Sequence, residues 1–129
     1  MKNQNFYLKK DDLVDSAKNP NNYGLLQKYD FICSKQNISC GDSVVICGVI
    51  KDGVLQDVRF EGRGCMLNIA MASKLTDFVK GKSIEDILLL NDEIIQKLLG
   101  LQLGMNRMQC AMLSVIALVE GISDFKNKN

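Results

Sequence analysis

Three cysteines stand in three separate local settings along this chain. Cys40 precedes Gly41-Asp42, Cys65 follows Gly62-Arg63-Gly64, and Cys110 lies 45 residues further on. None of them has a second cysteine at the C-x2-C spacing that is typical of a closed structural zinc site. Thiols this far apart in sequence can meet only through the tertiary fold, so we expect an open and reactive site. The first hypothesis is a protein that handles sulfur or metal.

The neighbours of these cysteines favour metal binding or nucleophilic chemistry. Cys65 is predicted to begin a long helix, where free N–H groups and the Arg63 cation favour thiolate over thiol. The same argument applies to Cys110, which is predicted to lie in the first turn of the last helix. Asp42 follows Cys40 and adds a carboxylate, and three thiolates with one carboxylate suit zinc or a labile iron–sulfur cluster.

Other residue types narrow the chemistry further. The two remaining cysteines, Cys33 and Cys47, fall inside predicted strands, so we expect them to be small buried hydrophobic residues. The chain has no histidine, which excludes a Ser-His-Asp or Cys-His nucleophile system within it. A structural zinc domain that serves only as an interaction module is less favoured, because such sites are normally closed and built from Cys and His.

Length and composition set the broad class. With 129 residues, 47% apolar and 24% charged, the chain is predicted to form a single domain over residues 1–129. A formal net charge of +1 gives no indication of nucleic acid or a membrane surface as partner. No run reaches the roughly 18 apolar residues that a membrane span needs. The first ten residues lack the apolar stretch of a secretory signal, so we expect a cytoplasmic protein with reduced cysteines.

Residue patterns indicate strands first and helices after them. The expected strands are Tyr29–Cys33, Ser43–Ile50 and Val54–Phe60, the last two joined by the turn residues Asp52-Gly53. This order predicts an α+β fold in which a small three-stranded antiparallel sheet carries helices on one face.

Helix signals follow the third strand. Helices are expected from Cys65 to a stop at Gly81, from the capping residue Ser83, from Asn91 to Leu99, and from about Arg107 to Phe125 with Asn106 as cap. Residues 1–22, with a short helix from Asp11 to Lys18, are expected to be a mobile N-terminal arm.

Several segments of the chain carry a family resemblance: Lys18–Gly24, Cys40-Gly41-Asp42, Phe60–Cys65 with Ile69–Ser73 after it, Val79–Ser83, and Arg107–Leu113. They resemble the iron–sulfur cluster assembly scaffolds of the IscU, SufU and NifU N-terminal type. The resemblance implies a SufE/NifU-like α+β sandwich with an exposed site at one end. It also implies a protein that accepts sulfur from a cysteine desulfurase, collects iron, builds a [2Fe–2S] cluster and passes it to apo-proteins.

By position, the resemblance implies that Cys40, Asp42, Cys65 and Cys110 hold the cluster or zinc, with Asp42 as the labile ligand. Two sulfur acceptors stay open. In the IscU manner Cys110 accepts the persulfide sulfur, whereas in the SufU manner Cys40 leaves the zinc and accepts it. The leading interpretation is therefore a scaffold that is not an enzyme by itself. The alternative is a zinc-dependent sulfurtransferase that relays persulfide.

The chain departs from both branches of the family. Gln109 stands where IscU proteins have a histidine, and Leu103–Arg107 replaces their Leu-Pro-Pro-Val-Lys segment, which puts a dedicated Hsp70 chaperone partner in doubt. Arg107 resembles SufU proteins, but the insertion that SufU proteins carry between the second and third cysteines is absent here. The sequence therefore combines the length of IscU with a third motif of the SufU kind.

Overall fold

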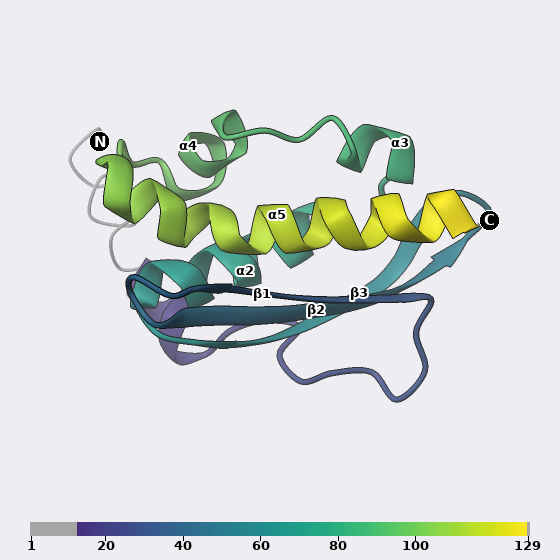
Figure 1. The fold of residues 1–129 in the computed structure, drawn as a ribbon, viewed down its shortest axis with the longest axis horizontal. Coiled ribbons are helices and arrows are strands. Elements are labelled where there is room, and N and C mark those ends of the chain that lie inside the picture. Colours follow the sequence, from purple (N-terminus) through teal and green to yellow (C-terminus); the bar gives the residue numbers. More distant parts are fainter. Residues whose placement is uncertain (1–12, 129) are drawn as a thin grey trace.

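The computed structural model describes residues 13–128, in which three strands precede a series of helices. The elements are β1 (Phe31–Asn37), β2 (Asp42–Lys51), β3 (Val54–Arg63), α2 (Met66–Val79), α3 (Ile84–Ile87), α4 (Glu93–Leu99) and α5 (Met105–Lys128). Residues 13–18 are also helical. The helices α2, α3, α4 and α5 lie on one side of the sheet, with α2 and α5 next to it and α3 and α4 further out (Figure 1). The predicted α+β class with a three-stranded sheet is confirmed.

The sheet is an antiparallel meander in the order β1-β2-β3. Asp52 and Gly53 both have positive φ, 54° and 74°, and form the two-residue turn between β2 and β3. A tight hairpin needs this backbone, and an Asp-Gly pair adopts it at little cost, so the predicted hairpin is confirmed.

All three strands extend beyond their predicted ends, β2 by only one residue at each end, Asp42 and Lys51. β1 begins at Phe31 and continues to Asn37, although its last residues are polar. Within residues 13–128 it is an edge strand that pairs with β2 and no other strand, so exposed polar side chains are tolerated there. β3 continues to Arg63, because Arg63 pairs with Ser43 of β2. This extra pairing brings Gly64 and Cys65 alongside the start of β2.

The helix predictions hold except at two starts. α2 and α3 follow the predicted signals, and Ser83 Oγ accepts the N–H of Asp86 as a cap should. α4 begins two residues later than predicted, at Glu93. The prediction that Asn106 caps the last helix is wrong, because α5 begins at Met105 and Asn106 lies within it. The helix starts earlier because Gly104 O accepts the N–H of Met108 at 2.9 Å.

The predicted N-terminal arm falls partly outside the described residues, which begin at Leu13. Its last part is tied to the domain. The N–H of Asn21 donates to Ser73 Oγ at 2.8 Å, and Asn22 Nδ2 donates to Asp77 Oδ1 at 2.9 Å. The chain after it crosses the sheet face opposite the helices, where the N–H of Leu26 reaches Cys47 Sγ at 3.4 Å. Residues 19–24 thus run along α2 and the outer edge of β3, where the N–H of Gly24 donates to Phe60 O at 2.8 Å, and the next residues reach the second face of the sheet.

The long helix α5 packs directly on β1 through glycine. Phe31 of β1 fits between Gly48 of β2 and Gly121 of α5. A Cβ at Gly121 would lie 2.7 Å from Phe31 Cδ2, and a Cβ at Gly48 would lie 2.6 Å from Phe31 Cε1. Glycine inside a helix makes the helix less stable by about 1 kcal/mol than alanine would. The close packing against Phe31 explains why glycine is nevertheless present at position 121. By length and composition α5 is also long enough to cross a membrane, but half of its most apolar stretch is buried within the fold, as in a core helix.

We expect Gly121→Ala to destabilise the fold, because the new methyl group has no room beside Phe31. The free energy of unfolding should fall by about 1–2 kcal/mol, since overpacking outweighs the gain in helix propensity. Urea denaturation measures this change. Gly104→Ala is the matched control, because a Cβ there meets nothing within 4 Å. A Gly121→Ala protein as stable as the wild type would contradict this account of the packing.

Candidate metal centre

Four different places in the fold supply the predicted ligands. Cys40 lies in the turn between β1 and β2, and Asp42 is the first residue of β2. Cys65 is the N-cap residue of α2, directly after β3, and Cys110 lies in the second turn of α5. The β1–β2 turn, the end of β3 and the beginnings of two helices meet at one end of the sheet, so the fold brings the four side chains together.

Three of the four predicted ligand atoms, those of Cys40, Asp42 and Cys110, lie close enough for a single metal ion, and Cys65 lies outside this group. The Sγ atoms of Cys40 and Cys110 are 3.1 Å apart. These two sulfurs and a carboxylate oxygen of Asp42 all lie within 4.8 Å of one another. Cys65 contacts the group through Asp42, because its Sγ lies 3.2 Å from Asp42 Oδ2. Residues separated by as many as 70 positions in the chain thus form one cluster.

Asp42 is the centre of this cluster. Its side chain is buried, with the residue only 1% exposed. The N–H of Cys65 donates to Asp42 Oδ1 at 2.8 Å. Burial by itself would raise the pKa of the Asp42 carboxyl, but the bonds from this N–H and from the three cysteine thiols outweigh it and lower the pKa. Asp42 is therefore a charged carboxylate toward which all three thiols are directed.

The pKa of the Cys110 thiol is raised, although a lowered pKa was predicted. Burial raises its pKa, and hydrogen bonds to Cys40 and Asp42, together with the negative charge of Asp42, raise it further. The prediction that Cys110 is a thiolate in the first turn of the last helix is therefore wrong. Because α5 begins at Met105, Cys110 lies in the second turn and is only 8% exposed. Without a metal, this thiol is a hydrogen-bond donor to the carboxylate.

One side of the cluster is open. Cys40 and Cys65 are exposed, whereas Asp42 and Cys110 are buried. The three thiols border a pocket of about 450 Å³ whose wall is mostly apolar and includes Leu101 and Leu103. Asn106 and Arg107 also line this pocket, and the Arg107 side chain is exposed. Among the described residues, this pocket offers a reactant a route to the sulfur atoms.

Gly64 makes the close approach of Asp42 and Cys65 possible. Its φ of +113° lies in the region that favours glycine. A Cβ at this position would overlap the Asp42 carboxylate. The residue between β3 and α2 must therefore lack a side chain for the carboxylate to sit against the N–H of Cys65.

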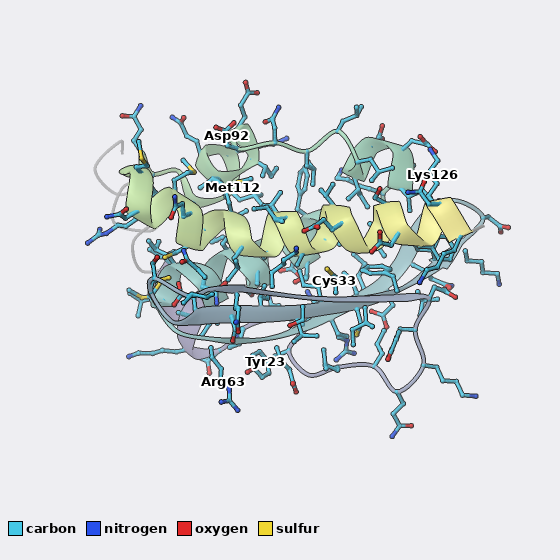
Figure 2. The ribbon with its side chains drawn as sticks, in the orientation of Figure 1. Tyr23, Cys33, Arg63, Asp92, Met112 and Lys126 are labelled. Atoms are coloured by element: carbon cyan, nitrogen blue, oxygen red, sulfur yellow. The ribbon has the colours of Figure 1, made fainter. Side chains whose placement is uncertain are left out.

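The remaining sequence candidates lie elsewhere. Cys47 is fully buried in β2, as predicted. Cys33 is half-buried and lies between α5 and the sheet, near the middle of the molecule (Figure 2). Neither belongs to the group of close ligand atoms among residues 13–128. Gln109 is exposed and lines a neighbouring groove with Ile38 and Met112, not the pocket of the thiols.

The donor set fits a thiophilic metal. Three sulfurs and one oxygen match the coordination that zinc or a [2Fe–2S] cluster takes from proteins. With Zn–S bonds of about 2.3 Å, two sulfurs on one tetrahedral ion lie about 3.8 Å apart, so Cys40 and Cys110 need to separate by well under 1 Å. The turn that carries Cys40 is exposed, and Gly41 after it has a φ of +76°. Such a small adjustment is well within the reach of this turn.

Fold and site together define a class of small α+β proteins that present thiols and a carboxylate at one end of a sheet. The chain belongs to the family described as NifU-like N terminal domain, whose model matches residues 8–129.

Relatives with known names support this assignment. The iron–sulfur cluster assembly scaffold protein IscU 1 of Archaeoglobus fulgidus is 34% identical over 92% of this chain and 77% of its own length. The zinc-dependent sulfurtransferase SufU of Bacillus subtilis is 31% identical over 91% of this chain and 90% of its own length. The crystal structure of the N-terminal part of a NifU-like protein from Brucella abortus has a TM-score of 0.74 at 20% identity, covering 94% of this chain and 99% of that one. This last match shows a shared fold.

The alignment with SufU relates to the insertion that SufU proteins were expected to carry relative to this chain. It is 134 positions long, which exceeds the 129 residues of this chain. The Bacillus protein therefore carries residues that have no counterpart here.

Some of the residues that lie next to the site were not predicted from the sequence. The apolar pocket wall formed by Leu101 and Leu103 is one example, and the buried amide of Asn68 is another. Asn68 had a signal: it is a polar residue one turn after Cys65, within a helix whose other neighbouring residues are apolar. Nothing in the sequence placed the two leucines at the site, because the loop before α5 shows no period; Leu103 was named only as the first residue of the segment that departs from the IscU pattern.

We expect Gly64→Ala to weaken metal binding far more than it weakens folding, because the methyl group displaces Asp42 from Cys65. Zinc content after purification and Zn²⁺ affinity by competition with a chelator measure this. Gly81→Ala is the matched control, since Gly81 also has a positive φ, 87°, with open space around it. Equal zinc affinity in the two variants would contradict the role assigned to Gly64.

Proposed function

We propose that this chain is an iron–sulfur cluster assembly scaffold. It accepts sulfur from a cysteine desulfurase, binds iron, builds a [2Fe–2S] cluster on Cys40, Asp42, Cys65 and Cys110, and transfers the cluster to apo-proteins. In this role the cluster is cargo, and the chain acts as a cytoplasmic assembly protein that turns over no substrate by itself. Its partners are the desulfurase and the recipient proteins, and neither nucleic acid nor a membrane takes part.

One observation carries the proposal: the sulfurs of Cys40 and Cys110 lie within 4.8 Å of each other and of a carboxylate oxygen of the buried Asp42, and Cys65 Sγ lies 3.2 Å from Asp42 Oδ2. Two of these three thiols are exposed. A structural zinc site is normally closed and needs no exposed ligand. A scaffold must both hold its cargo and release it, so partial exposure and one oxygen ligand suit it. Thiolates bind iron firmly, whereas a carboxylate is the harder and more exchangeable ligand for this metal.

The exposed thiol of Cys40 supports it as the first acceptor of sulfur. Its Sγ can attack the outer sulfur of a persulfide on the desulfurase, because the pocket leaves it open to solvent. A new S–S bond then forms on Cys40, the S–S bond of the donor breaks, and the donor cysteine leaves as a thiolate. The buried Cys110 lies 3.1 Å away and is placed to receive the sulfur from Cys40 in a second exchange of the same kind. Cys40 would thus be the first acceptor of the sulfur and Cys110 the second.

A zinc-dependent sulfurtransferase that relays persulfide is the second candidate. The same exposure of Cys40 supports it, as does Arg107 on the wall of the thiol pocket. In this case Cys40 leaves the zinc to accept sulfur, while Asp42, Cys65 and Cys110 keep the metal. The protein would then act with the desulfurase as an enzyme of sulfur transfer. The shorter region between Cys65 and Cys110, relative to SufU, favours the scaffold.

Anaerobic reconstitution distinguishes these functions. The chain is incubated with ferrous iron, cysteine and a cysteine desulfurase, and visible absorption is recorded together with iron, sulfide and zinc content. A scaffold develops [2Fe–2S] absorption with two irons and two sulfides per cluster. Bound zinc without a cluster, combined with faster desulfurase turnover in the presence of the chain, identifies the relay instead. Neither a cluster nor an effect on the desulfurase would refute both.

We expect Cys65→Ser to abolish cluster and zinc binding, since it replaces the sulfur that lies next to Asp42. Cys47→Ala and Cys33→Ala are the controls, because both remove a thiol that lies outside the centre. They should keep full metal content and change stability only, with Cys47→Ala costing about 1 kcal/mol for its buried sulfur. Metal analysis and thermal unfolding measure the two effects. Stoichiometric zinc in Cys65→Ser, or loss of metal from either control, would contradict the assignment of the ligands.

Removal of the Asp42 carboxylate should change how fast the [2Fe–2S] cluster is loaded and released. We expect Asp42→Ala to load cluster more slowly, because the thiols lose their common acceptor, and to release it several-fold more slowly once formed, because the exchangeable ligand is gone. Transfer to an apo-ferredoxin, followed by circular dichroism, measures the release rate. A cluster shorter-lived than that of the wild type would contradict the role of Asp42 as the labile ligand.

A further inference from the structure

Asn68 is a buried polar residue that links the two strand ends next to the metal centre. It lies in α2, one turn after Cys65, and is fully buried. Its side-chain Nδ2 donates to Ser43 O at 2.9 Å and to Arg63 O at 3.0 Å. Ser43 follows Asp42 directly, and Arg63 is two residues before Cys65. One amide thus bonds to both chain segments that supply these ligands.

The two bonds close the sheet at the end where it carries the site. Ser43 and Arg63 form the last pair of the β2–β3 ladder. Beyond this pair the chains lead to Asp42 on one side and to Gly64 and Cys65 on the other, with no further strand pairing between them. The Arg63 side chain points away from the helices (Figure 2), so its backbone carbonyl is what faces Asn68.

The chemistry of the amide is specific to this task. Both partners are carbonyl oxygens, so the group between them must donate two hydrogen bonds, and a short side chain that ends in NH₂ does so. The same requirement fixes which end of the amide is nitrogen. Asn68 Oδ1 is buried and has no hydrogen-bond partner among the described residues. An unsatisfied buried oxygen is unfavourable, so the two donated bonds must be what retains an asparagine at this position.

We propose that Asn68 is a positioning residue of the metal centre, which holds the strand ends bearing Asp42 and Cys65 at the separation needed to bind one metal ion or cluster. The proposal rests on the proposed function in one respect, that these two residues are ligands. It goes beyond that function because Asn68 itself offers no atom to the metal. It acts by fixing the backbone on both sides of the contacts between Asp42 and Cys65, which are 2.8 Å and 3.2 Å long.

The test is the affinity for Zn²⁺ of Asn68→Ala, measured by competition with a fluorescent chelator under reducing, anaerobic conditions. Loss of an interaction that orients a ligand typically weakens metal binding 10–100-fold, and we expect a loss in this range. If Asn68→Ala does not fold, Asn68→Ser carries the test. Its hydroxyl can donate one bond and not two, so a loss in the same direction is expected.

Thr76→Ala is the matched control. Thr76 is also fully buried on α2, where its Oγ1 donates to Ala72 O at 2.8 Å and accepts from Asn22 Nδ2 at 3.0 Å. It lies eight residues after Asn68, about 12 Å along the helix. The control should lose stability while keeping the wild-type affinity for Zn²⁺.

A spectroscopic readout separates positioning from a general loss of stability. Co²⁺ in place of zinc reports ligand geometry through its visible d–d bands and its thiolate charge-transfer bands. We expect altered bands in Asn68→Ala and unchanged bands in Thr76→Ala. A folded Asn68 variant with wild-type affinity and bands would overturn the proposal. Failure of the wild type itself to bind a stoichiometric metal ion would refute the proposed function instead.

Discussion

The buried carboxylate of Asp42 is the interaction on which the site depends. An ionised group away from water is stable only where hydrogen bonds or opposite charges replace its hydration. Here the N–H of Cys65 and the three cysteine thiols supply those bonds. These donors come from the β1–β2 turn, the β3–α2 junction and α5, so satisfying one anion fixes the relative positions of all three. The carboxylate therefore organises the thiols before any metal arrives.

This arrangement prepares the site for metal without closing it. A metal ion takes the place of thiol protons, so its uptake releases protons and weakens as the pH falls. Burial raises the pKa of the Cys110 thiol, so in the proposed metal site this competition is stronger at Cys110 than at an ordinary thiol. Cys40 and Cys65 remain exposed beside an apolar pocket, which suits a site where sulfur must enter and cargo must leave.

Close backbone packing at both ends of the sheet supports the site, which lies at one of them. At one end Gly64 lets the Asp42 carboxylate approach the start of α2, and Asn68 ties the strand ends together. Towards the other end Gly121 lets α5 rest on Phe31. Because α5 also carries Cys110, its seating on β1 determines where that sulfur lies relative to Cys40. The apolar core and the metal centre are therefore linked through one helix.

Local sequence determined the order of strands and helices, the Asp52-Gly53 hairpin, the stop at Gly81 and the choice of candidate ligands. These features follow from the conformational preferences of short segments and from the chemistry of single side chains. The extension of β3 to Arg63, the start of α5 at Met105 and the burial of Cys110 were decided by the tertiary structure. So were the convergence of thiols on Asp42 and the two bonds of Asn68. The physical reason is the same in each case: a strand pairing, a buried hydrogen bond or a pKa depends on partners distant in the chain, which local patterns do not contain.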